Sequence, residues 1–122
     1  MAKSGLVDNS SMNGHDAEHY AASFLQQHNL ILLDQNFRCR FGEIDLIMQD
    51  KQTLVFVEVR MRSSESFGGA AASISSGKQK KLLSTARHYL AKLSYEPACR
   101  FDAVLISGTD HHIDWIKDAF GE

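Results

Sequence analysis

Residues 42–60, which read GEIDLIMQDKQTLVFVEVR, constrain the fold of this chain more than any other segment. Two apolar runs flank a polar turn at residues 49–52, which is the pattern of a β-hairpin. The second run, LVFVEVR, is apolar on both faces, and strands of this kind lie inside a sheet rather than at its edge. We therefore expect a sheet in which residues 54–60 form a central strand.

Both strands of this hairpin carry acidic side chains among apolar ones. Strand side chains alternate between the two faces of a sheet, so each strand is expected to present one set together: Glu43, Asp45 and Ile47 in the first, Leu54, Phe56, Glu58 and Arg60 in the second. A charge in a half-buried strand costs free energy unless a partner offsets it. Several acids and a cation at the open end of one hairpin therefore predict a metal site with a chemical role.

The remaining segments predict helices packed on a mixed sheet. Apolar residues recur at helical spacing over residues 14–28 and again over residues 78–93. Further strands are expected at 30–33, 36–41 and 100–107, and the segment 113–120 is expected to be a strand or a helical turn. The order α, β, β, β, α, β predicts an α/β fold in which helices flank a central mixed β-sheet.

The length of 122 residues suffices for one domain and is too short for two. We expect a flexible N-terminal tail over residues 1–13, a single domain over residues 14–122, and a flexible loop at 63–77. No apolar run approaches the roughly 20 residues that a membrane helix needs. A polar run at 8–16 stands where a signal peptide requires an apolar core. The sequence therefore predicts a cytoplasmic protein with no membrane contact.

Asp45 and Glu58 are the natural ligands for a divalent cation, and Glu18 in the first helix is a third candidate. Hydrolysis of a phosphodiester needs an attacking water, neutralisation of the phosphate and help for the leaving oxygen, and divalent cations can supply all three. Mg²⁺ or Mn²⁺ is expected, because Mg²⁺ takes one or two protein carboxylates and keeps its waters. Arg60 follows Glu58 on the same face and is expected to contact a phosphate.

The geometry of the turn leaves two candidates for the first ligand. A four-residue turn at 49–52 would put Glu43 directly opposite Glu58 and Asp45 on the diagonal, so either acid could reach the cation. Asp45 lies deeper in the strand and is favoured. Glu43, next to Gly42, is the alternative that this geometry leaves open.

Basic residues are concentrated around the acidic hairpin, although the chain has a net charge of −2. Residues 37–92 hold ten Lys/Arg and five Asp/Glu, a net of +5, whereas the other residues hold three and ten, a net of −7. Phosphate-binding sites combine cations for the backbone with a few acids for a metal. The candidates for contact with DNA are Arg38, Arg40, Arg62, Lys78 and Lys81. The alternative is an ordinary solvated surface of mixed charge.

The sequence resembles the D…(D/E)-x-K motif of the restriction-endonuclease-like nucleases. The matching residues are Asp45, a spacer of twelve residues, and then Glu58-Val59-Arg60. GEIDLI followed by VFVEVR is similar to archaeal Holliday-junction resolvases. Over about residues 14–120 the chain resembles the YraN family of small bacterial proteins in an ordered set of positions: Gly14…Glu18…Ala21, Asn36-Phe37-Arg38, Gly42-Glu43-Ile44-Asp45, Phe56-Val57-Glu58-Val59-Arg60 with Arg62, Phe67-Gly68, Lys78, and Arg100-Phe101-Asp102. This resemblance implies a restriction-endonuclease-like core and a metal site at Glu18, Asp45, Glu58 and position 60.

Position 60 departs from the nuclease motif. The lysine of that motif donates to the phosphate and helps to orient or deprotonate the attacking water. Arg60 keeps the positive charge and adds a bidentate fork, but it stays protonated at any working pH and cannot act as a base.

The sequence therefore predicts a Mg²⁺- or Mn²⁺-dependent endonuclease-like protein acting on DNA, in particular on branched or damaged structures. Its expected catalytic residues are Glu18, Asp45, Glu58 and Arg60. Because so small a domain offers little area for binding a large DNA, we also expect a homodimer. A competing hypothesis is a nucleic-acid-binding or assembly module that keeps the nuclease fold without the chemistry. A third is a protein-interaction domain whose acids form only structural pairs.

Overall fold

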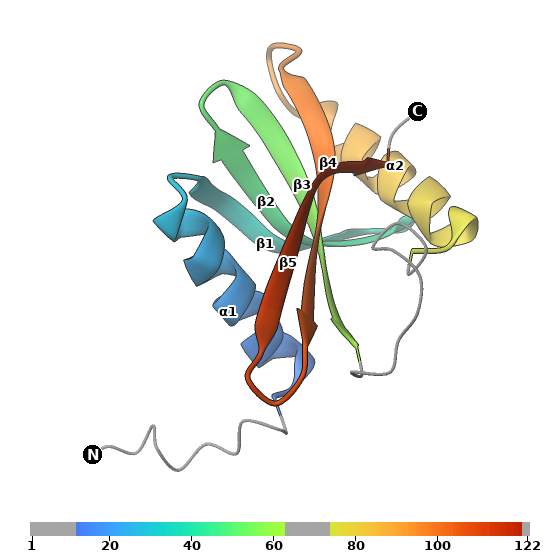
Figure 1. The fold of residues 1–122 in the computed structure, drawn as a ribbon. Coiled ribbons are helices and arrows are strands. Elements are labelled where there is room, and N and C mark those ends of the chain that lie inside the picture. Colours follow the sequence, from blue (N-terminus) through green and yellow to red (C-terminus); the bar gives the residue numbers. More distant parts are fainter. Residues whose placement is uncertain (1–11, 63–73, 121–122) are drawn as a thin grey trace.

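The computed structural model describes residues 12–62 and 74–120, which form a five-stranded sheet with two helices (Figure 1). The elements are α1 (Gly14–Gln27), β1 (Ile31–Cys39), β2 (Gly42–Asp50), β3 (Thr53–Arg62), α2 (Ser76–Leu90), β4 (Ala98–Ser107) and β5 (His112–Phe120). The strands lie in the order β1-β2-β3-β4-β5; β3 and β4 are parallel and the other neighbours are antiparallel. The expected α/β fold with a central mixed sheet is confirmed. Most of the expected tail at 1–13 and loop at 63–77 lies outside the described residues.

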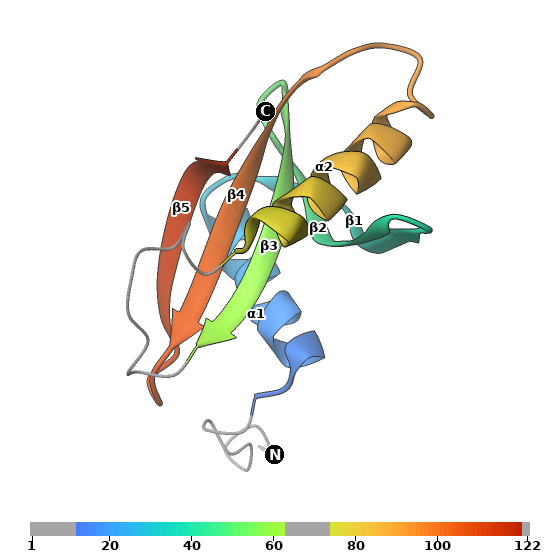
Figure 2. The same cartoon turned by 90° about the vertical axis from the view of Figure 1, so that its right-hand side faces the viewer.

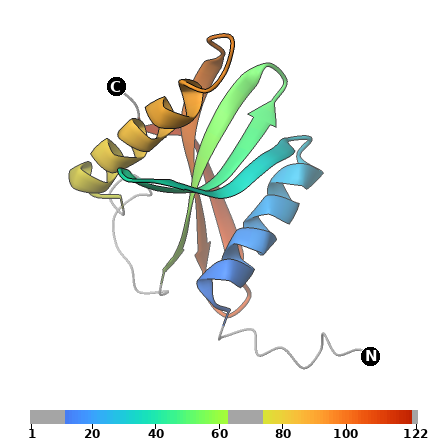
Figure 3. The ribbon, with the colours of Figure 1, turned by 180° about the vertical axis from the view of Figure 1, so that it is seen from behind.

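The two helices cover opposite faces of the sheet, with α1 and α2 on either side of the strands in Figure 1 and again, from behind, in Figure 3. Alternate residues of β3 pack on the face covered by α1 and on the face covered by α2. Val55 and Val57 pack in the cluster that contains α1, whereas Leu54 and Phe56 pack in the cluster that contains α2. β3 is thus buried on both faces and lies in the middle of the sheet, as its sequence predicts.

Both helices begin at side-chain caps. Asn13 accepts a hydrogen bond from the backbone N–H of Asp16 (2.8 Å), and Ser75 accepts one from the N–H of Lys78 (3.1 Å). α2 ends at Leu90, slightly before the expected end, although the chain continues with a further backbone bond from residue 93 to residue 90. Within the described parts of the chain, neither helix is long and apolar enough to cross a membrane.

β1 is one continuous strand where two short strands were expected. Its register against β2 shifts between Leu32 and Asp34, so Leu33 is an extra residue in a β-bulge. Asn36 adopts a φ of +54°, a conformation that asparagine tolerates better than most residues. These two irregularities interrupt the alternation along the strand, which is why periodicity divided it into two segments.

The turn between β2 and β3 consists of Lys51 and Gln52, two residues shorter than the expected turn. Lys51 has a φ of +58°, which tight hairpin turns require. The paired positions run from this turn to Leu46 opposite Val57. The register therefore differs by two residues from that of a four-residue turn.

β2 changes faces along its length. Ile44 and Ile47 pack in the α2 cluster, whereas Leu46 and Met48 pack in the α1 cluster. A regular strand would put Ile44 and Leu46 on one face. The alternation is therefore interrupted at Asp45, between them.

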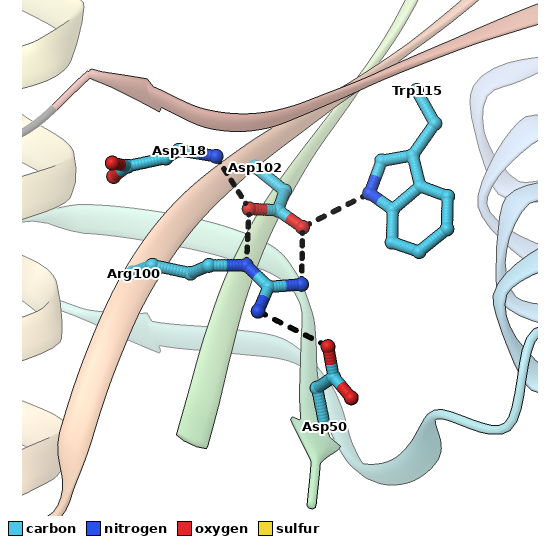
Figure 4. A network of polar contacts seen from close by, with 5 residues as sticks. All are labelled: Asp50, Arg100, Asp102, Trp115 and Asp118. Atoms are coloured by element: carbon cyan, nitrogen blue, oxygen red, sulfur yellow. Dashed lines mark hydrogen bonds and ion pairs between the residues drawn. The ribbon is translucent and has the colours of Figure 1, made fainter.

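A buried carboxylate joins β4 to β5 and to the far end of β2 (Figure 4). Asp102 is fully buried and accepts hydrogen bonds from Arg100 Nε (2.9 Å) and Nη2 (3.2 Å), from Trp115 Nε1 (2.9 Å) and from the backbone N–H of Asp118 (2.9 Å). Arg100 Nη1 lies 3.1 Å from a carboxylate oxygen of Asp50. Hydrogen bonding to Asp102 raises the pKa of the Arg100 guanidinium. Both Asp102 oxygens are thus satisfied by three different residues.

Replacing Asp102 with asparagine is expected to lower the free energy of unfolding by about 2–3 kcal/mol, because an amide nitrogen would replace one buried oxygen and could not accept from its present donors. Urea denaturation measures this change. Asp118→Asn is the matched control, since its exposed carboxylate points away from the network in Figure 4, and it should change the stability by no more than about 0.5 kcal/mol. Equal stability of the two variants would contradict a bracing role for Asp102.

Candidate metal site and its basic surroundings

Three partly buried carboxylates from two elements meet beside α1. Oxygen atoms of Glu18 in α1 and of Glu43 and Asp45 in β2 lie within 4.8 Å of one another. Ile47, which was expected on the face of these acids, packs in the α2 cluster instead because the alternation of β2 is interrupted. The structure therefore brings together both candidates for the first ligand, Glu43 and Asp45, with the helix carboxylate of Glu18.

Asn36 connects two of these carboxylates and was not among the residues predicted for the site. Its side-chain nitrogen donates to Glu18 Oε1 at 2.7 Å and to Glu43 Oε2 at 3.1 Å. The residue thereby fixes the helix carboxylate against the strand carboxylate. A polar asparagine at the start of the predicted strand 36–41, where the apolar alternation fails, was the signal that could have identified it.

Asp45 lies where the paired part of β2 and β3 ends. Its Oδ2 accepts a hydrogen bond from the backbone N–H of Val59 at 2.8 Å. Continuing the observed register puts Asp45 opposite Glu58, so the expected placement of Glu43 there is wrong. Burial raises the pKa of Asp45 to about 8, and the charges of Glu58, Glu18 and Glu43 act in the same direction, whereas the bond from Val59 lowers it.

Glu58 lies next to this trio but outside the 4.8 Å grouping formed by the described residues. Its side chain is only 5% exposed, and its Oε2 lies 3.4 Å from Lys78 Nζ and 3.7 Å from Arg60 Nη1. Its other oxygen, Oε1, is buried and has no hydrogen-bond partner among the residues that the structure describes. The four residues predicted to be catalytic thus form two adjoining groups, the acids beside α1 and the Glu58–Arg60 pair with Lys78.

The donors of this site suit a hard divalent cation. Carboxylate oxygens are the ligands that Mg²⁺ and Mn²⁺ prefer. Negative charge is crowded around Asp45, and the buried Oε1 of Glu58 lacks a partner among the described residues. A cation held by the trio would relieve the crowding around Asp45, so Glu18, Glu43 and Asp45 fit a site for a hard divalent cation such as Mg²⁺ or Mn²⁺.

Basic side chains adjoin the acids along the β1–β2 turn and along α2. Arg38 Nε lies 3.5 Å from Glu43 Oε2. Gly42 approaches α2 so closely that a Cβ added there would lie 3.7 Å from Cβ of Lys81. Lys78 lies one turn earlier on the same helix. Three of the five predicted DNA contacts therefore border the candidate metal site.

The other two predicted DNA contacts lie at the ends of strands. Arg40 is in the β1–β2 turn, where its guanidinium carbon lies 5.0 Å from the centre of the Phe41 ring. Arg62 is the last residue of β3 and pairs with Ser107 of β4. Contact with DNA remains a prediction for all five basic residues.

Asp45→Asn is expected to change how stability depends on pH when no divalent cation is present. Asp45 ionises at its ordinary pKa of about 4 in the unfolded chain but keeps its proton to about pH 8 in the folded chain. A raised acid pKa means that the folded state binds the extra proton, so the stability contributed by this group falls as pH rises from about 4 to 8. The variant lacks this loss, and it should gain stability relative to the parent protein, by up to about 5 kcal/mol across that window.

Urea denaturation at pH 5 and pH 8 measures the difference between the two proteins. Saturating Mn²⁺ should reduce the difference at pH 8, because a cation that binds only the folded parent adds stability of about 2.7 kcal/mol at a hundred times its Kd. Parallel pH profiles for the parent and Asp45→Asn would show that this carboxyl does not hold the proton.

Comparison with known proteins identifies the family. The model described as "Uncharacterised protein family UPF0102" matches residues 17–106. A UPF0102 protein of Nitrosomonas europaea is 64% identical over 110 residues, which cover 89% of this chain and 93% of that protein. One of Nitrosospira multiformis is 57% identical over 110 residues (89% and 92%), and one of Psychromonas ingrahamii is 51% identical over 117 residues (96% of each). The chain therefore belongs to the UPF0102 family, which is the YraN family that its motifs resemble.

Proposed function

We propose that this protein is a phosphodiesterase that cleaves DNA with the help of Mg²⁺ or Mn²⁺. The observation that carries the proposal is the buried oxygen of Glu58, which has no partner among the described residues, beside the carboxylate trio of Glu18, Glu43 and Asp45. The observed order α, β, β, β, α, β, β contains the order predicted from apolar spacing, and a restriction-endonuclease-like core is what the family resemblance implies. The two acids of the nuclease motif, Asp45 and Glu58, lie on the neighbouring strands β2 and β3.

The acids and their hydrogen-bond partners would form the metal site. A divalent cation held by Asp45, Glu58 and Glu18 would neutralise the scissile phosphate and lower the pKa of the attacking water. The Val59 N–H orients the Asp45 carboxylate, and Asn36 orients that of Glu18. These oxygens are therefore held in place before the substrate arrives, which reduces the cost of reorganisation during the reaction.

Lys78 takes the part that the nuclease motif assigns to its lysine. Its Nζ lies 3.4 Å from Glu58 Oε2, closer than Arg60 Nη1 at 3.7 Å. Lys78 comes from α2, so a motif read along β3 does not include it. The compact ammonium group of Lys78 supplies positive charge at the reacting phosphate, and the planar guanidinium of Arg60 binds phosphate oxygens in a bidentate manner.

Cleavage is expected to require Mg²⁺ or Mn²⁺ and to be lost in Glu58→Gln by about 100-fold or more, since the amide is neutral. A panel of single-stranded, duplex, flap and four-way-junction DNA measures the activity. Glu96→Gln, at an exposed position in the connection between α2 and β4, is the matched control and should retain it. Cleavage that survives Glu58→Gln would indicate a contaminating nuclease.

A second candidate function is DNA binding without cleavage. It is favoured by one observation, the arginine at position 60 where the nuclease motif has a lysine. Binding of the panel by the parent protein, with no cleavage in either cation, would favour this function over the first. Binding that weakens steeply with salt is expected in both cases, because the basic residues would release counterions from the phosphates.

Lys78→Met is expected to reduce cleavage by about 100-fold while leaving the protein folded, because it removes the charge but keeps an unbranched side chain. Lys80→Met, at an exposed position two residues along α2, is the matched control. Arg60→Lys should retain most of the activity if Lys78 already supplies the ammonium group. Full activity in Lys78→Met would show that Lys78 does not act as the motif lysine. Position 60 would then hold that role, and Arg60→Lys should raise the rate of cleavage.

A further inference from the structure

We propose that the β1–β2 turn is a binding site for an unpaired nucleobase, in which Phe41 is the stacking surface and Arg38 and Arg40 bind the adjoining phosphates. This inference rests on the proposed function. It names the class of DNA that the site selects, namely DNA with an unpaired nucleotide next to the point of cleavage.

The two residues of the β1–β2 turn, Arg40 and Phe41, are not the types that a turn of this length favours. Cys39 pairs with Gly42, which leaves Arg40 and Phe41 between the strands. Hairpin turns of this length favour Asn-Gly or Asp-Gly. The core does not explain the phenylalanine either, because Phe41 is 40% exposed. Gly42, with a φ of +153°, meets the unusual backbone requirement, so Arg40 and Phe41 are available for another role.

Contacts with α2 hold the turn in one position. The Phe41 ring lies edge-on to His88 with the ring centres 6.3 Å apart, and Phe37 lies edge-on to Tyr89 at 5.1 Å. Gly42 lies against the helix at Lys81. Figure 2 shows the β1–β2 hairpin reaching past the rest of the sheet beside α2. The aromatic surface is therefore preformed, and little conformational entropy is lost when it binds a ligand.

The turn adjoins the candidate metal site on two sides. Glu43 of the carboxylate trio follows Phe41 by two residues. Arg38 Nε lies 3.5 Å from Glu43 Oε2. On α2, Lys81 under the turn and Lys78 at Glu58 are one helical turn apart, a rise of about 5 Å. A base stacked on Phe41 would therefore belong to a nucleotide close to the scissile phosphate.

The chemistry of the turn selects an unpaired base. Proteins that bind single strands combine a basic path for the backbone with aromatic rings on which bases stack. Arg38, Arg40 and Lys81 supply the positive charge, and Phe41 supplies the ring. Bases within a duplex already stack on their neighbours, so their faces are covered. Flaps, forks and single strands leave a base face open to Phe41.

Binding of two DNAs of equal length tests the site, one a flap with unpaired bases and the other a complete duplex. Fluorescence anisotropy is measured in Ca²⁺, so that cleavage does not interfere. Phe41→Ala should weaken binding of the flap by about ten-fold, the usual effect of losing one stacked base, and should leave binding of the duplex unchanged. Phe41→Leu, which keeps apolar volume without a π face, should behave in the same way. Phe41→Trp should bind the flap as well as the parent does.

Tyr95→Ala is the matched control, because Tyr95 is an aromatic residue that is 59% exposed in the connection between α2 and β4. It should bind both DNAs as the parent does. 2-Aminopurine in the flap should be quenched by the parent and by Phe41→Trp but not by Phe41→Leu. Equal affinities of the parent and Phe41→Leu for the flap would overturn the base site and leave the proposed nuclease standing. Failure of the parent to bind either DNA would overturn both proposals.

Discussion

The hydrogen bond from the Val59 N–H to Asp45 marks the point at which β2 and β3 stop pairing regularly, and the candidate site depends on that interruption. Continued pairing would set Asp45 directly opposite Glu58, and like charges in that position are destabilising. The structure instead places Asp45 with the acids beside α1 and Glu58 with the cations of α2. Burial and then the charge of Glu58 raise the pKa of Asp45, so the two carboxylates still act on each other. A proton or a cation can reduce this repulsion, and only the cation leaves both carboxylates available as ligands.

Two buried carboxylates in this sheet, Asp102 and Glu58, differ in how their oxygens are satisfied. Asp102 receives hydrogen bonds at both oxygens, from Arg100, Trp115 and the backbone of Asp118. Within residues 12–62 and 74–120, Arg60 and Lys78 both lie beside one oxygen of Glu58, while the other oxygen is buried with no partner there. The first arrangement stabilises the fold by satisfying every acceptor. The second leaves a cost that a water, a ligand or a residue outside the described parts can remove.

Patterns within one element were predictable from the sequence, and relations between elements were not. The apolar faces of residues 54–60 predicted the central strand, and helical spacing predicted α1 and α2. The two-residue turn at Lys51 was missed because it depends on a positive φ that no apolar pattern encodes. Asn36 was missed for the same reason, since its place between Glu18 and Glu43 goes with a φ of +54° inside β1. Lys78 was predicted as a DNA contact, but its proximity to Glu58 depends on how α2 docks on the sheet.

The first turn of α2 determines where Lys78 lies. Ile74 is buried in the α2 cluster, and the Ser75 side chain accepts the Lys78 N–H at 3.1 Å, so the first turn of the helix is fixed at both its core and its cap. A cap residue acts on the backbone and not on the substrate, yet here it orients the cation nearest to Glu58. The nuclease motif, read along β3 alone, ends at Arg60. In three dimensions, the positive charge beside Glu58 also comes from a second element, because Lys78 lies on α2. The position of Lys78 therefore depends on how firmly the first turn of α2 is held.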